Sequence, residues 1–297
     1  MSEAIKRLPD FIIIGAAKSG TTSLVQHMLQ HPRIYISDPK EPCFFDENEN
    51  WKMGIDWYSS LYINAKEDQI CGEASTNYTR WPQVMNVPAK IKSIIPNVKL
   101  IYLLADPSKR AYSHFVHRWT KETHSGEPFK IGFFDYVKND PMCLDSSYYL
   151  MQLERYLEYF PKEQILPVIF EQLIHQPEET MEKILNFLGL TMEQNMDKAL
   201  PHANENKEFR YHMARKKLVN SLNQNKTIFF LKRFSPKPLR KYIYNRFFAS
   251  LKIVKQQEEA MTPPALTKQE QIELIGMFKG PNKHLAREWN LDIDCWS

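Results

Sequence analysis

The chain alternates between short strand-like runs and amphipathic segments with helical spacing. Strand-like runs lie at residues 11–14, 33–36, 69–75, 98–104 and 165–170. The first and the fourth are the most continuously apolar, as is typical of central strands. A proline interrupts the last run, which is awkward in a central position. Strands that alternate with helices in this way predict a parallel sheet.

The predicted helices occupy most of the sequence between these strands. Asp56 is expected to cap one of them, Gly189 to end another, and Gly280 with Pro281 to break the last helical region into two. The helices are predicted at residues 23–29, 56–62, 82–95, 148–160, 177–188, 267–278 and 281–289, with a further one beginning at Pro107. The fold class is therefore α/β, a P-loop-type parallel sheet flanked by helices on both faces, with a helical C-terminal part.

A glycine-bracketed loop joins the first strand to the first helix. Its sequence, Gly-Ala-Ala-Lys-Ser-Gly-Thr-Thr at residues 15–22, follows the order of strand, loop and helix that phosphate-binding loops share. Gly15 and Gly20 allow the loop to curl, so that the N–H groups at the helix start converge on one anion. A turn that merely packs is the other interpretation, but the register of glycines, lysine and hydroxyls favours an anion site.

The lysine of this loop does not stand where a nucleotide hydrolase has it. In those enzymes the lysine directly follows the second glycine, a position that Thr21 holds here, whereas Lys18 lies inside the loop. A lysine so placed suits a short, two-group anion better than a triphosphate. The loop resembles that of enzymes that use 3′-phosphoadenosine 5′-phosphosulfate (PAPS), and the chain, except for residues 209–261, resembles a PAPS-dependent sulfotransferase.

The resemblance implies a donor site built on this loop. Lys18 would bind the phosphosulfate and stabilise the departing oxygen, while Ser19, Gly20, Thr21 and Thr22 would donate hydrogen bonds to the 5′-phosphate. PAPS is then the donor, and adenosine 3′,5′-bisphosphate (PAP) is the product. No metal is expected, because a sulfonate carries less negative charge than a phosphoryl group and no Asp/Glu/His cluster in the sequence has obvious ligand spacing.

The sequence Lys-Glu-Pro-Cys-Phe-Phe-Asp at residues 40–46 resembles a stretch of heparan sulfate sulfotransferases in which the glutamate is the general base. By this match Glu41 is the base. Its place between a proline and two aromatic residues suggests partial desolvation, which would raise its pKa; the other interpretation is a surface glutamate paired with Lys40. Gly-Ile-Asp-Trp-Tyr at residues 54–58 also resembles the N-sulfotransferase subgroup, either as an acceptor-site wall or as an ordinary packed helix.

Two further positions belong to the resemblance. Glu73 aligns with the glutamate of a Glu-Lys-Ser/Thr strand end, but Ala74 stands in place of the lysine, so one cation is lost and Glu73 is a second candidate for base or orienting group. His117, four residues after Ser113 on one helix, matches a histidine of the N-sulfotransferases that could assist proton transfer. A lone helical histidine more often packs or faces solvent.

Residues 104–113 resemble the 3′-phosphate motif Arg-Asp-Pro-x-x-Arg-Ala-x-Ser. Ser113 matches the serine that holds the 3′-phosphate, but Ala105 replaces the first arginine. A phosphate dianion is costly to bury without a cation. Lys207 and Arg210, in the region where the family has a basic loop over the nucleotide, are the candidates to replace it.

The formal net charge of +4 hides a strongly basic segment. Residues 202–255 hold 14 Lys and Arg against 2 acidic residues, while the rest of the chain holds 25 against 33. Such a segment attracts phosphate, sulfate, an acidic carrier or a membrane surface. We expect a single sulfotransferase domain over residues 1–297, with a basic helical insertion or lid at about 202–260 that is consistent with an anionic or carrier-bound acceptor.

The sequence indicates the acceptor only as a general class of molecule. The resemblance implies transfer to a hydroxyl or amine of a small molecule, natural product or glycan, and no nucleic-acid partner is expected. The first ten residues have neither the length nor the apolar content of a signal or membrane segment, so a cytoplasmic location is expected. Family members of the secretory pathway usually carry a membrane anchor, so the chain looks like a stand-alone bacterial or cytosolic form, or a trimmed catalytic domain.

Two other functions are open on the sequence. A P-loop kinase that transfers phosphate from ATP to a small molecule would need a lysine after Gly20 and an aspartate that holds magnesium, for which Asp106 is the strand-end candidate. A non-enzymatic module could bind polyanions or a membrane through residues 202–255, where phenylalanines alternate with lysines. Thr21 contradicts the first requirement of the kinase.

Overall fold

A computed structural model describes residues 7–46, 49–125, 131–193, 196–197 and 263–296. The chain divides into two compact units, residues 1–118 with 131–202 and 265–297, and residues 119–130 with 203–264. The sheet and the candidate site belong to the first unit. The predicted basic insertion at about 202–260, including Lys207 and Arg210, lies outside the described residues.

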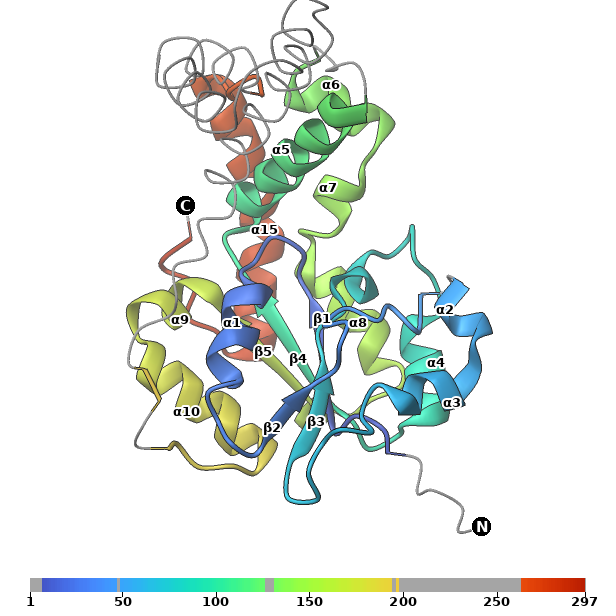
Figure 1. Ribbon diagram of the computed structural model, residues 1–297. Helices are drawn as coiled ribbons and strands as arrows, with labels where there is room; N and C mark the ends of the chain where they lie inside the picture. Colours follow the sequence, from blue (N-terminus) through green and yellow to red (C-terminus); the bar gives the residue numbers. More distant parts are fainter. Residues whose placement is uncertain (1–6, 47–48, 126–130, 194–195, 198–262, 297) are drawn as a thin grey trace, which may run out of the picture. The chain divides into compact units, whose positions relative to one another are not determined.

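The described part of the first unit contains a five-stranded sheet in which every paired strand is parallel. The strand order is β2-β3-β1-β4-β5 (Figure 1), so the strand that precedes the glycine-bracketed loop is central. This confirms the predicted fold class. The strands are β1 (Phe11–Gly15), β2 (Ile34–Ile36), β3 (Ile70–Glu73), β4 (Lys99–Leu104) and β5 (Ile165–Ile169).

Alternate residues of the central strands pack into two hydrophobic cores, one on each face of the sheet. Ile12 and Ile14 belong to one core, and Phe11 and Ile13 to the other, as the two-residue period of a strand requires. Helices α3 (Gly54–Ser60), α4 (Val87–Ile94), α8 (Tyr149–Leu157) and α15 (Lys268–Trp289) line the first core. Helices α1 (Thr21–Met28), α9 (Phe170–His175) and α10 (Pro177–Leu188) line the second (Figure 1).

Shorter elements connect these layers. Several of them lie in segments where the sequence alone gave no prediction, because they are only one or two turns long and carry little periodicity. They are α2 (Glu49–Lys52), η1 (Thr76–Thr79), α6 (Phe133–Asn139), α7 (Met142–Asp145) and η2 (Lys162–Gln164), while the predicted helix after β4 is α5 (Pro107–Ser125).

The structure decides three local predictions made from the sequence. The predicted break at Gly280 and Pro281 is wrong, because α15 continues through Pro281. The expected cap at Asp56 is also wrong, since α3 begins at Gly54 and Asp56 lies in its first turn. The proline in the last strand, Pro167, is compatible with a strand because β5 lies at the edge of the sheet.

None of the described helices combines the length and apolar character needed to cross a membrane.

Candidate active site

The loop between β1 and α1 has the backbone of an anion-binding turn. Lys18 and Gly20 adopt positive φ angles of 71° and 84°, and the amide of Ser19 donates to the carbonyl of Ala16 at 3.1 Å. A chain that turns through left-handed residues brings successive N–H groups to one side. The loop is therefore curled as the sequence predicts.

Neighbouring side chains hold this loop from several directions. A Cβ added to Gly20 would meet the ring of Phe170 at 2.0 Å, and one added to Gly15 would meet Thr79 Oγ1 at 2.1 Å, so both positions require glycine. Arg110 is completely buried and donates from Nη1 to the carbonyl of Ala17 at 3.1 Å. The same guanidinium donates to Ser147 Oγ at 2.6 Å and to the carbonyl of Cys143.

The donor groups of this loop suit a negatively charged ligand. No side chain caps α1 within the described residues, and its first turn contains no acidic residue. Ser19 is fully buried, and its Oγ, which lies beside the hydroxyl of Tyr149, forms no hydrogen bond of ordinary geometry within the described part of the chain. A buried hydroxyl beside an uncapped helix start is costly unless a ligand uses it. These residues fit the phosphosulfate end of PAPS.

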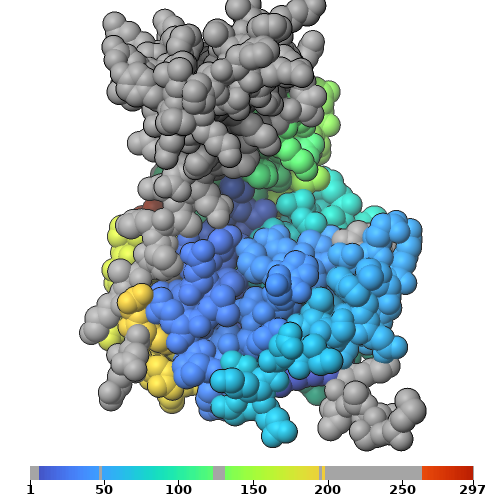
Figure 2. All heavy atoms as spheres, viewed as in Figure 1, coloured from blue at the N-terminus to red at the C-terminus, as the bar shows by residue number. Residues whose placement is uncertain are grey.

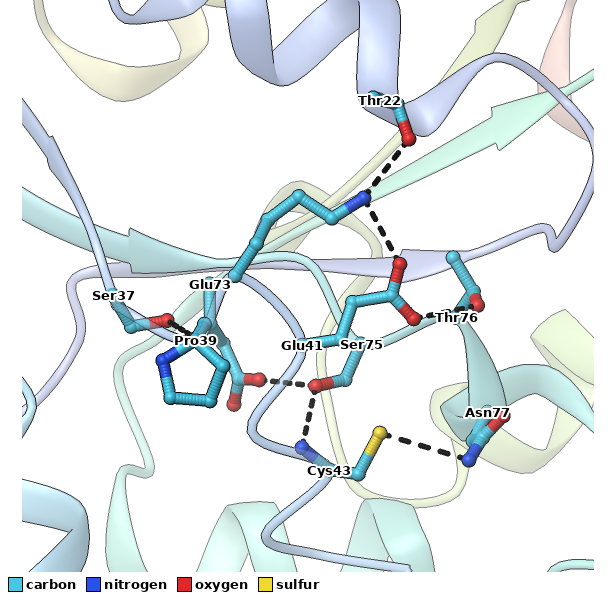
Figure 3. Close-up of polar contacts among 10 residues, drawn as sticks. Thr22, Ser37, Pro39, Glu41, Cys43, Glu73, Ser75, Thr76 and Asn77 are labelled. Atoms are coloured by element: carbon cyan, nitrogen blue, oxygen red, sulfur yellow. Dashed lines mark hydrogen bonds and ion pairs between the residues drawn. The ribbon is translucent and has the colours of Figure 1, made fainter. Parts of the chain in front are cut away.

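The candidate base is connected to this loop through Lys40. Lys40 Nζ lies 3.1 Å from Thr22 Oγ1, in the first turn of α1, and 2.9 Å from Glu41 Oε1. Thr76 Oγ1 donates to the other oxygen of Glu41 at 3.2 Å (Figure 3). The structure therefore brings Thr22 and Glu41, two of the predicted site residues, into contact with one ammonium group.

Glu41 is more exposed than the sequence suggested. Its side chain is 38% exposed, whereas Phe44 and Phe45 point into the hydrophobic core, where Phe44 stacks on Tyr58 at 4.4 Å between ring centroids. The aromatic residues anchor residues 37–46, which we call the base loop, instead of covering the carboxylate. The base loop belongs to the early part of the chain, coloured blue, which forms much of the surface seen in Figure 2.

Glu73 lies beneath the base loop as a fully buried carboxyl group. It accepts hydrogen bonds from Tyr58 Oη at 2.5 Å, from Tyr78 Oη at 3.2 Å and from Ser75 Oγ. Two of these hydroxyls accept in turn from the base loop, since the amide of Cys43 donates to Ser75 Oγ at 2.9 Å (Figure 3) and that of Phe45 donates to Tyr78 Oη at 3.2 Å. Of the two roles considered for Glu73, this geometry supports the orienting one.

Burial raises the pKa of Glu73 to about 7, against hydrogen bonds from Ser75, Tyr58 and Tyr78 that lower it. A carboxyl group with a raised pKa binds its proton more tightly in the folded chain than in the unfolded one. Its contribution to stability is complete below its unfolded pKa of about 4.5 and is lost as the pH rises through about 7.

The Glu73→Gln variant is expected to lose less stability than the wild type between pH 5 and pH 8. The wild type should lose on the order of 3 kcal/mol of unfolding free energy to this group across that window, and the neutral amide cannot titrate. Urea denaturation at pH 5 and pH 8 measures the change in unfolding free energy for each protein. Comparing the two changes removes the contribution of the other titrating groups, which both proteins share. A gap between the two proteins that stays constant with pH would contradict this account of Glu73.

The predicted 3′-phosphate element folds as a strand end followed by α5. Ala105 is buried and its carbonyl accepts from Tyr149 Oη at 2.7 Å, so the position of the missing arginine is filled by packing. Ser113 is half-buried, and His117 is exposed one turn later. His114, on the same helix, is buried, and its pKa is lowered to about 2 by burial and by nearby Arg110.

Asp106 serves the helix in which it lies. It is buried, and its Oδ1 accepts from the amide of Ser108 at 3.0 Å and from that of Lys109 at 3.3 Å, while its Oδ2 pairs with Lys109 Nζ at 3.1 Å. A carboxylate that caps a helix and pairs with a lysine is a poor magnesium ligand. The kinase alternative therefore fails at Asp106 as well as at Thr21. No group of three or more His, Cys, Asp or Glu residues in the described ranges could hold a metal ion.

Sequence reasoning missed two residues that the geometry brings into the site. Lys40 was considered only as a partner of Glu41, although its position directly before the candidate base was a signal. Arg110 occupies the second arginine position of the 3′-phosphate motif, and its contact with the loop at Ala17 spans 93 residues of sequence. Such long-range contacts leave no mark on local periodicity.

Known proteins resemble this chain in sequence and in structure. The family model described as "Sulfotransferase domain" matches residues 8–233. Human bifunctional heparan sulfate N-deacetylase/N-sulfotransferase 3 is 33% identical over 213 residues, which cover 65% of this chain and 24% of that protein. Human heparan sulfate glucosamine 3-O-sulfotransferase 3A1 is 31% identical over 196 residues, 64% of this chain and 46% of that protein. The chain thus spans about a quarter of the first relative and less than half of the second.

Among solved structures, a sulfotransferase from Alicyclobacillus acidocaldarius superposes with a TM-score of 0.55 and 25% sequence identity. The superposition covers 70% of this chain and 91% of that one.

Proposed function

The chain belongs to the sulfotransferase domain family, and from this premise we propose that it transfers a sulfuryl group from PAPS to a hydroxyl or amine of an acceptor, with Glu41 as general base. The acceptor is a small molecule, a natural product or a glycan. Both a hydroxyl and an amine are proposed, since relatives named for heparan sulfate include an N-sulfotransferase and a 3-O-sulfotransferase. The sequence match extends over most of the described first unit, including the base loop.

One observation carries the proposal. The carboxylate of Glu41 and Thr22 in the first turn of α1 both contact Lys40 Nζ, at 2.9 Å and 3.1 Å. An anion held at the start of α1 is therefore within reach of a proton acceptor. In-line transfer needs this arrangement, because the attacking atom must lose its proton beside the donor's sulfur.

Each residue of the site has a distinct task in this proposal. PAPS, when bound, supplies an activated sulfonate. Lys18 and the N–H groups around Ser19 hold its phosphosulfate end, and Lys18 stabilises the negative charge left on the phosphate oxygen when the sulfur–oxygen bond breaks. Glu41 takes the proton of the acceptor hydroxyl or amine as that atom forms its bond to sulfur. Thr76, through its hydrogen bond to Glu41 Oε2, keeps the carboxylate in position.

The remaining assignments concern the far end of the nucleotide and the proton path. Ser113 would contact the 3′-phosphate, and Lys207 and Arg210 would supply the charge that Ala105 cannot. His117, exposed one turn beyond Ser113, would assist proton transfer. These four roles rest on the sequence resemblance.

Calorimetric titration of PAP, with and without magnesium, tests the donor. We expect PAP binding that does not depend on magnesium, because the groups that would bind its phosphates are an ammonium group and backbone N–H groups. ATP with magnesium is the comparison ligand. A clear preference for ATP with magnesium over PAP would overturn the proposal and restore the kinase.

A further inference from the structure

Lys40 occupies a position that the base assignment alone does not explain. Its backbone lies beside Ala74, because the amide of Ala74 donates to the carbonyl of Lys40 at 3.0 Å. Ala74 is fully buried and has no side chain that could reach a ligand. Lys40, on the neighbouring loop, extends its ammonium group to the start of α1 instead.

The ammonium group has one more donor than the described contacts use. A lysine ammonium carries three N–H bonds, and its described partners are Thr22 Oγ1 and Glu41 Oε1. The side chain is 26% exposed, and the ammonium group contacts both the first turn of α1 and Glu41, so its third N–H is available to a ligand bound there. An acceptor oxygen placed there would receive a charge-assisted hydrogen bond.

We propose that Lys40 is a catalytic residue that binds the sulfonate oxygens of the donor. It would supply the cation that is missing because Ala74 stands where the motif has a lysine. This inference rests on the proposed function. As the sulfonate passes from the phosphate oxygen to the acceptor, its oxygens stay beside the ammonium group, which stabilises their charge throughout. Lys18 stabilises the leaving phosphate, and Glu41 takes the proton of the attacking atom. Lys40 would stabilise the third reacting group, the transferred sulfonate.

Comparing PAPS with PAP isolates this contact, because the two nucleotides differ only by the sulfonate. Calorimetry on the full chain should give about 10- to 100-fold weaker PAPS binding for Lys40→Met than for the wild type, the size expected for one charged hydrogen bond. PAP affinity should change by less than about 3-fold. Lys18→Met should instead weaken both nucleotides.

Two matched variants separate this role from simple ion pairing. Glu41→Gln removes the partner of Lys40 without removing the ammonium group, and should leave PAPS affinity unchanged. Lys52→Met removes an exposed lysine that is paired with Glu49 at 2.6 Å, and should change neither nucleotide's affinity. If Glu41→Gln weakens PAPS as much as Lys40→Met does, the lysine only holds the base loop and the proposal is wrong.

A measurement on the wild type covers the case in which Lys40→Met fails to fold. Amine-reactive labelling followed by mass spectrometry should show stronger protection of Lys40 by PAPS than by PAP. Equal protection, or equal loss of affinity for both nucleotides in the variant, overturns the role of Lys40 while leaving the donor assignment intact. If neither nucleotide binds the wild type, the proposed function fails, and the role of Lys40 fails with it.

Discussion

Lys18→Met is expected to weaken binding of both PAP and PAPS by about 100-fold or more, the loss typical when one partner of a desolvated charge pair is truncated. Methionine keeps most of the length of the side chain and makes the same demand on the left-handed backbone at this position, where φ is 71°. The fold of the loop should therefore survive, because Gly20, Arg110 and Phe170 still hold it. Calorimetric titration of each nucleotide measures the loss.

The control for this variant is Lys109→Met. Lys109 follows the neighbouring strand end, but its side chain is 65% exposed and pairs with Asp106, so its loss should leave nucleotide affinity within about 3-fold. Thermal unfolding of both variants checks that they are folded. An affinity of Lys18→Met for PAP within a factor of about two of the wild type would remove the basis of the donor site.

Glu41→Gln is expected to lower turnover by about 100- to 10,000-fold, the usual contribution of a general base. An amide cannot accept the proton, yet its oxygen can still accept the hydrogen bond from Thr76, so the base loop should keep its position. Donor affinity should remain that of the wild type, because the loss falls on the chemical step. The measurement is transfer of labelled sulfate from PAPS to an acceptor found by screening phenols, alcohols, amines and desulfated glycans.

Glu49→Gln is the matched control, since Glu49 is an exposed carboxylate paired with a lysine, as Glu41 is. Its turnover should equal that of the wild type. Glu41→Asp, which keeps the carboxylate but shortens its reach, should retain part of the activity. A Glu41→Gln enzyme that works at more than about a fifth of the wild-type rate would show that another group takes the proton.

The sheet and its functional edge could be predicted because the information is local. The apolar run before Gly15 and the loop up to Thr22 lie next to each other in the sequence, and the carboxyl ends of parallel strands gather on one edge whatever the details of packing. Glu73 is the last residue of β3 and Asp106 lies just beyond the end of β4, so both stand at this edge, as the alternation of elements predicts. The strand with Pro167 is harder to predict from local sequence, because its place at the edge of the sheet is set by the whole topology.

The continuity of α15 could not be predicted, because it depends on tertiary packing. Leu274, Phe278, Leu285 and Trp289 are all buried along this helix, and Phe278 packs against Tyr148 with ring centroids 5.0 Å apart. Burying one such side chain contributes about 1.5–3 kcal/mol, comparable with the roughly 3 kcal/mol that a proline costs within a helix. A prediction that considers only the sequence around the proline does not include this stabilisation by packing.

The surroundings of Glu41 were misjudged for a similar reason. Proline and two phenylalanines beside a glutamate suggest an apolar environment, but a sequence does not say in which direction each side chain points. The rings of Phe44 and Phe45 turn toward Tyr58, and the carboxylate turns toward Lys40. The hydroxyl network around Glu73, which joins segments about 30 residues apart, was equally invisible.

The packing of Phe170, Thr79 and Arg110 around the glycine-bracketed loop has a kinetic and entropic consequence. These contacts form when the chain folds, so the receptor for the donor is preorganised and little conformational freedom is left to freeze on association. Nucleotide capture should then proceed as encounter with a ready-made surface, and differences in affinity among variants of this loop should appear mainly in the dissociation rate.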